Sequence, residues 1–133
     1  MGMSTNRRRV RTALVAAVLA HLVISIAHGT AHTGAHVPLS PAASLFVYAV
    51  ILAGPLVGLA LVWLAESLGT WVIMLTMAGS LVFGVINHFV FDSPDHVSQV
   101  DPQWRLLFAT TAVLLAATEV LGVGLAQMFR RAA

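Results

Sequence analysis

The chain has no cysteine and no lysine, and only 9% of its 133 residues are charged. The absence of cysteine excludes disulfides, thiolate metal sites and clusters held by cysteine. A soluble domain carries about 25% charged residues, so this chain has too little charge to cover a surface that faces water. Apolar residues make up 59% of it, and its mean hydropathy is +0.90. The composition therefore argues against a water-soluble domain and predicts that most of the protein lies in lipid.

The positive charge of the chain is confined almost entirely to its ends. The formal net charge is +2 and the isoelectric point is about 10.5, a value that basic nucleic-acid-binding domains also reach. Six of the seven arginines lie near the termini: Arg7, Arg8, Arg9, Arg11, Arg130 and Arg131. Arginines that flank apolar segments are typical of membrane topology signals and of contact with anionic lipid. We therefore expect membrane lipid as the partner of these charges, and no nucleic acid.

Four apolar stretches cover most of the chain, and each is close to the roughly 20 residues that a helix needs to cross the hydrocarbon core. Helix is the expected state, because every backbone polar group in lipid must be satisfied within its own segment. The fold class is therefore predicted to be an all-α integral membrane protein, a bundle of four transmembrane helices in a single domain, residues 1–133. The predicted spans are residues 10–30, 41–65, 70–91 and 102–129.

Proline and glycine mark the boundaries of these spans. Ser40-Pro41 and Asp101-Pro102 each place a capping side chain before a proline suited to the first helical position. Gly54-Pro55 lies inside the second span and predicts a kink there. Gly69-Thr70 is expected to break the chain between the second and third spans.

The loops between the spans indicate how the bundle is oriented. The polar loops 31–40 and 92–101 contain no arginine or lysine, whereas both termini are basic. The positive-inside rule then predicts that both termini are cytoplasmic (N-in/C-in) and that these loops face the periplasmic or extracellular side. A competing interpretation takes Arg7–Ala31 as a cleaved leader, which would leave three spans.

Histidines and carboxylates gather at the outer ends of the first and third spans. On a helix, His28, His32 and His36 step by four residues and share one face. Side chains at this spacing lie about 5–6 Å apart at Cβ, so two imidazoles can chelate one ion. His88 and Asp92 repeat the four-residue step.

Because both stretches leave the membrane on the same side, the sequence predicts one metal site between them. The expected ligands are His28, His32, His88, Asp92 and His96. Imidazole with carboxylate suits several divalent transition metals, of which zinc or iron is expected. If the site is catalytic, Asp95 and His36 are the candidate acid–base residues. Asp95 and Asp101 could instead orient the imidazoles, and Asp101 is also a simple helix cap.

Two other interpretations of the cluster stay open. Histidines on two helices of a membrane bundle can ligate haem b, as in an electron-transfer subunit. The carboxylates favour an ion, because axial haem ligation does not need them. The same residues could also be solvent-exposed loop residues at the membrane interface that form no site.

His21 and Glu119 are ionisable groups predicted to lie at similar depth within the membrane. Glu119 is about ten residues from the cytoplasmic end of the fourth span, roughly 15 Å along a helix. A contact between the two could fix the packing of the first and fourth helices, or could continue a proton path from the outer cluster.

The sequence thus predicts a small membrane metalloprotein, and whether it is an enzyme stays open. An enzymatic role would be that of a metal-dependent hydrolase or oxidoreductase with a lipid-soluble substrate. The alternatives are the haem-binding subunit and an accessory subunit for ion or proton transport. Small residues such as Gly54 and Gly58 would allow close helix packing in a homo-oligomer or with a partner subunit.

Overall fold

The computed structural model describes residues 5–132, and all the regular structure in that range is helical. The π-helical segments η1 and η2 continue the α-helices beside them. The elements in chain order are α1 (Thr5–Gly34), α2 (Pro41–Phe46), η1 (Val47–Ala53), α3 (Gly54–Leu64), α4 (Glu66–Val85), η2 (Ile86–Val90) and α5 (Pro102–Arg131). The all-α prediction is confirmed.

These elements form four helices that are long and apolar enough to cross a membrane. Two are α1 and α5; the others are the continuous runs Pro41–Leu64 and Glu66–Val90. The first helix starts before its predicted limit, because the arginines that precede the apolar stretch are themselves good helix formers.

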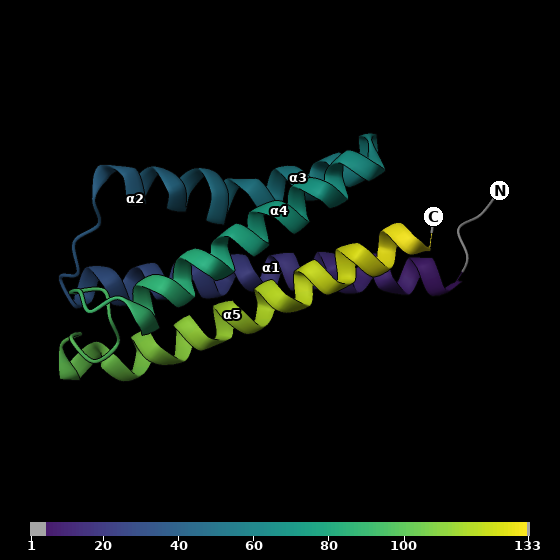
Figure 1. The fold of residues 1–133 in the computed structure, drawn as a ribbon. Coiled ribbons are helices and arrows are strands. Elements are labelled where there is room, and N and C mark those ends of the chain that lie inside the picture. The colour runs from purple at the N-terminus through teal and green to yellow at the C-terminus, as the bar shows by residue number, and fades with distance from the viewer. Residues whose placement is uncertain (1–4, 133) are drawn as a thin grey trace.

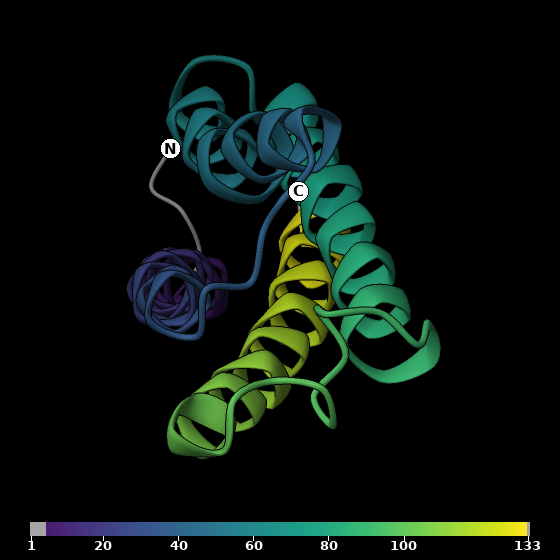
Figure 2. The ribbon, with the colours of Figure 1, turned by 90° about the vertical axis from the view of Figure 1, so that its left-hand side faces the viewer.

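The bundle has two distinct ends (Figure 1). The start of α1, the end of α5 and the turn after α3 lie at one end, here called the terminal end. The connections 35–40 and 91–101 lie at the other, here called the loop end. Helix α1 packs along α5, and α4 packs against both α3 and α5. Seen from the loop end, α1 lies to one side of the α2–η1–α3 run (Figure 2), and it contacts η1 and α3.

The predicted capping residues are confirmed. Ser40 Oγ accepts a hydrogen bond from the Ala43 amide at 3.1 Å, and Asp101 Oδ1 accepts one from the Gln103 amide at 2.8 Å. In the second span, the π-helical segment η1 ends directly before Gly54-Pro55, and α3 begins there. The helix therefore continues through the proline without a break. A π segment is one of the ordinary ways in which a helix accommodates such an interruption.

The predicted break at Gly69-Thr70 is wrong. The chain turns at Ala65, whose φ of −147° and ψ of 78° are not helical, and Gly69 lies inside α4. A Cβ at Gly69 would overlap main-chain atoms of Leu61 and Val62 on α3. This glycine therefore serves close helix packing and not a turn.

Candidate metal centre

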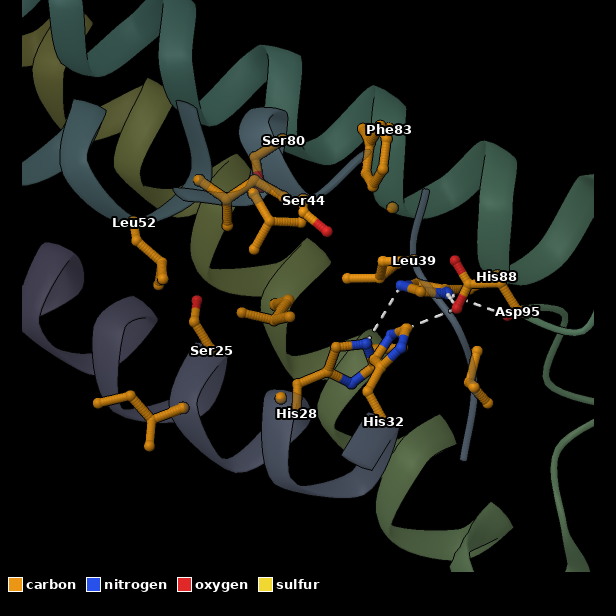
Figure 3. A pocket seen from close by; sticks show the side chains of 18 of the residues that line it. Ser25, His28, His32, Leu39, Ser44, Leu52, Ser80, Phe83, His88 and Asp95 are labelled. Carbon is orange, nitrogen blue, oxygen red and sulfur yellow. Dashed lines mark hydrogen bonds and ion pairs between the residues drawn. The ribbon is translucent and has the colours of Figure 1, made fainter. Parts of the chain in front are cut away.

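Three histidines from two helices converge near the loop end of the bundle (Figure 3). Helix α1 carries His28 and His32 one turn apart, and η2 carries His88. One ligand nitrogen from each ring lies within 4.8 Å of the others. His28 and His88 are buried, each with 6% of its surface exposed, and His32 is partly buried. These three residues are called the histidine triad below.

A threonine on α5 sets the tautomer of neutral His28. Thr111 Oγ1 lies 2.7 Å from the carbonyl oxygen of Leu107, and because a carbonyl only accepts, the hydroxyl donates there. His28 Nδ1 lies 2.8 Å from the same Oγ1, so Nδ1–H is the donor in that contact. The lone pair of His28 Nε2 is then free.

A backbone carbonyl in the 91–101 connection sets the tautomer of neutral His88. Nδ1 of His88 donates to the carbonyl oxygen of Asp95 at 3.1 Å, which leaves Nε2 bare in the neutral ring. The Nε2 atoms of His28 and His88 lie 3.2 Å apart. Two neutral rings held this way turn lone pairs toward each other, which is unfavourable unless a cation lies between them.

Asp95 lies beside the other two rings of the triad. Its Oδ1 is 3.3 Å from His32 Nε2 and 3.3 Å from His88 Nδ1. Burial alone would raise the pKa of Asp95, but its close contact with His88 and the charge that His88 and His32 can carry hold this pKa below its ordinary value. Because the folded pKa is the lower one, the carboxylate stabilises the fold above about pH 4, and this contribution is lost as the pH falls.

His32 has a nitrogen with no partner in the described chain. Its Nδ1 is buried, and it neither accepts nor donates a hydrogen bond within residues 5–132. Buried polar atoms are nearly always paired, and each exception calls for an explanation such as a bound ion. The donor set therefore fits a metal ion.

Phe108 forms an apolar floor under the triad. Its ring, fully buried on α5, lies with its centroid 4.7 Å from that of His28, 4.8 Å from His32 and 5.1 Å from His88. Contact with all three rings restricts their rotation, so the triad is held in place by packing as well as by hydrogen bonds.

If the histidine triad holds zinc, we expect Asp95→Asn to weaken its binding about 10- to 100-fold, because a carboxylate that orients ligand imidazoles contributes about that much to affinity. The measurement is a competition titration with a chromophoric chelator. Asp92→Asn is the matched control, since Asp92 is exposed and its Oδ1 accepts only from Gln99, at 2.9 Å. Equal affinities of the two variants would show that Asp95 has no such role.

The structure does not bring Asp92, His96 or His36 to the triad. Helix α1 ends at Gly34, and His36 lies beyond it, exposed and with a φ of 52°, so the four-residue step is interrupted. Residue Phe91 is extended, which turns Asp92 outward. His96 Nδ1 is 2.7 Å from Ser98 Oγ, away from the three rings. Asp101 caps α5, as one interpretation expected.

His21 and Glu119 are in contact nearer the middle of the bundle, as their matched depths suggested. His21 Nε2 lies 3.2 Å from Glu119 Oε1, and both residues are buried, with 1% and 3% of their surface exposed. Ser80 on α4 donates a hydrogen bond to the same Oε1. The contact joins α1, α4 and α5.

A cavity of about 400 Å³ connects these two polar groups. It is bounded by α1 on one side and by α2 and η1 on the other, with α4 and α5 between them. The triad and Asp95 line its loop end, and Glu119 and Ser80 line it farther inward. Its size falls within the range of small-molecule sites in proteins, about 300–1,000 Å³.

Sequence reasoning missed the supporting residues of the centre. Ser25 lines the cavity and Thr111 fixes His28, but neither stood out as a site residue. A signal for Ser25 was present: His21, Ser25, His28 and His32 follow steps of four, three and four residues, which places them along one face of a helix. Nothing in the sequence singled out Phe108 among the other apolar residues.

No protein family, curated protein or solved structure matches this chain.

Proposed function

We propose that this chain is a small integral membrane metalloprotein. In this proposal, His28, His32 and His88 hold one divalent transition metal ion, zinc or iron, and Asp95 orients the imidazoles. The site belongs to the non-cytoplasmic end of the bundle and faces the cavity, where a lipid-soluble substrate can reach it. A three-histidine site with a fourth position open to a cavity is the arrangement used by catalytic zinc, which activates water or polarises a substrate oxygen.

The observation that carries the proposal is the pair of bare Nε2 atoms on His28 and His88. Nitrogen ligands about 2.0–2.1 Å from a tetrahedral zinc ion lie about 3.3 Å apart. The observed separation is 3.2 Å. A shared proton could also bridge these two atoms, but it would leave the buried Nδ1 of His32 without a partner.

The same geometry favours an ion over haem b. Two axial histidines of a haem have their ligand nitrogens about 4 Å apart, with the porphyrin plane between them. The rings of His28 and His88 instead meet edge to face, with centroids 4.8 Å apart. There is no room for a macrocycle between them in this arrangement.

The placement in a membrane rests on the outer surface of the helices. Large apolar side chains on all four are exposed, among them Val23, Leu64, Leu75 and Leu106 at 65% or more. Such a surface is satisfied by lipid and not by water. The arginines of both ends of the chain then lie together at the terminal end, where Arg11 stacks on Trp63 and Arg130 on Trp71.

Cysteine labelling tests the proposed orientation, since the chain has no cysteine of its own. We expect a membrane-impermeant maleimide to label Ser98→Cys in intact cells and to label Ser67→Cys only after the membrane is opened. Both serines are exposed, one at the loop end and one at the terminal end. The reverse pattern would place the histidine triad on the cytoplasmic side.

The function itself is tested by elemental analysis and a visible spectrum of the detergent-purified protein. We expect one zinc or iron per chain and no Soret band. A Soret band would move the protein to the haem class. Protein that holds no metal, even after incubation with zinc or iron(II), would refute the proposal.

A further inference from the structure

The cavity beside the histidine triad has ionisable groups at two separate places and a mostly apolar wall between them. One polar place is the triad, and the other is formed by Glu119, Ser80 and Ser25. Side chains of η1, α4 and α5 form most of this wall: Val47, Ile51, Leu52, Phe83, Ala112 and Leu115. Such a cavity is shaped for a molecule with an apolar body and two polar ends.

One carboxylate oxygen of Glu119, Oε2, accepts no hydrogen bond within the described residues. Both of the hydrogen bonds that it accepts, from His21 and from Ser80, use Oε1. Within residues 5–132, no donor reaches Oε2. A carboxylate accepts up to about four hydrogen bonds, so Glu119 can accept one from a ligand in the cavity.

Ser25 presents a second unused group to the cavity. Its Oγ is buried and has no hydrogen-bonding partner in the described chain. The hydroxyl points from α1 into the cavity, toward the side of Ser44 and Ser80 (Figure 3). A buried hydroxyl without a partner is unfavourable, and a ligand that pairs with it gains accordingly.

A hydroxyl group is the ligand chemistry that satisfies both residues. It can donate to Glu119 Oε2 and, at the same time, accept from Ser25 Oγ–H. An ammonium group only donates, so it would leave the hydrogen of Ser25 unpaired.

We propose that the cavity binds an amphiphile with a metal-binding group at the triad, an apolar chain, and a terminal hydroxyl group that pairs with Ser25 and Glu119. This inference rests on the proposed function, because the first of these groups needs the metal ion. Eight residues of α5 separate Glu119 from Thr111, the partner of His28, and eight residues rise about 12 Å. The substrate class is therefore a medium-chain amphiphile hydroxylated at its far end.

The test compares two probes on the zinc-loaded protein in phospholipid nanodiscs by calorimetry: octanohydroxamic acid and 8-hydroxyoctanohydroxamic acid. The hydroxamate binds the metal, and only the second probe carries the terminal hydroxyl. We expect the hydroxylated probe to bind about tenfold tighter, the value of a well-made hydrogen bond or two. The four-carbon pair, butanohydroxamic acid and its 4-hydroxy derivative, is expected to show no such gain.

Ser25→Ala gives the matching variant. It should lose the preference for the hydroxylated probe while its thermal stability does not fall, because the hydroxyl it removes has no partner in the protein. Ser44→Ala, at another serine that lines the cavity, should keep the preference.

The possible failures are separable. If zinc is bound and the two eight-carbon probes bind equally well, or neither binds, this inference is overturned and the metal centre stands. If the four-carbon pair shows the same gain, the assigned position of the hydroxyl is wrong. If the protein holds neither zinc nor iron, the proposed function is refuted, and this inference is refuted with it.

Discussion

Replacing His28 by alanine is expected to lower the affinity for zinc by more than about 100-fold. Loss of a residue that only orients a ligand costs up to about that factor, and His28 is proposed as a ligand itself. The variant also removes the partner of His88 Nε2 and the donor to Thr111 Oγ1, which keeps its own hydrogen bond to Leu107. His88→Ala should behave in the same way, because the two nitrogens face one site.

The control for these variants is His36→Ala, which removes an exposed imidazole only two residues beyond the end of α1. Affinities are measured by chelator competition on samples whose helix content and elution volume match the parent. A His28→Ala variant that folds normally and binds zinc as tightly as His36→Ala does would exclude His28 from the centre.

Gly69→Ala is expected to lower the free energy of unfolding by about 3 kcal/mol, at the upper end of what an overpacked site costs. The upper end is expected because the added Cβ would meet main-chain atoms of α3, among them Leu61 C at 2.6 Å and Gly58 O at 2.7 Å. Main-chain atoms cannot move aside as a side chain can, so α3 and α4 would have to separate. The measurement is a denaturant titration of the protein in mixed micelles.

Gly124→Ala on α5 is the matched control, since a Cβ there meets nothing within 4 Å. Its free energy of unfolding should stay within about 1 kcal/mol of the parent, the difference in helix propensity between the two residues. If both glycine variants unfold alike, the close approach of α3 and α4 at Gly69 does not hold in the folded protein.

Most of the fold could be predicted from composition and local chemistry. Long apolar runs require helix, and Ser40-Pro41 and Asp101-Pro102 mark where two helices begin, because both signals depend only on neighbouring residues. Gly69 misled the prediction, since glycine serves both turns and close packing. Only the position of α3 decides between the two, and that position is not a local property.

The part of the candidate site that depends only on local helical spacing could also be predicted. The four-residue step of His28 and His32 was informative because α1 continues through both residues. It was not informative for His36 or Asp92, since the helices end first. Asp95 lies in a connection without regular structure, and its approach to His32 and His88 depends on how that connection folds back. Helical spacing cannot anticipate such a return.

X-ray absorption spectroscopy of the zinc-loaded protein identifies the ligands of the ion and so tests whether the histidine triad is a metal centre. We expect one zinc per chain with three imidazole nitrogens at about 2.0 Å and one further light ligand. The His28→Ala/His88→Ala double variant should retain no such site. A spectrum without imidazole scattering, or with the same imidazole count in the double variant, would contradict the assignment of the histidine triad as a metal centre.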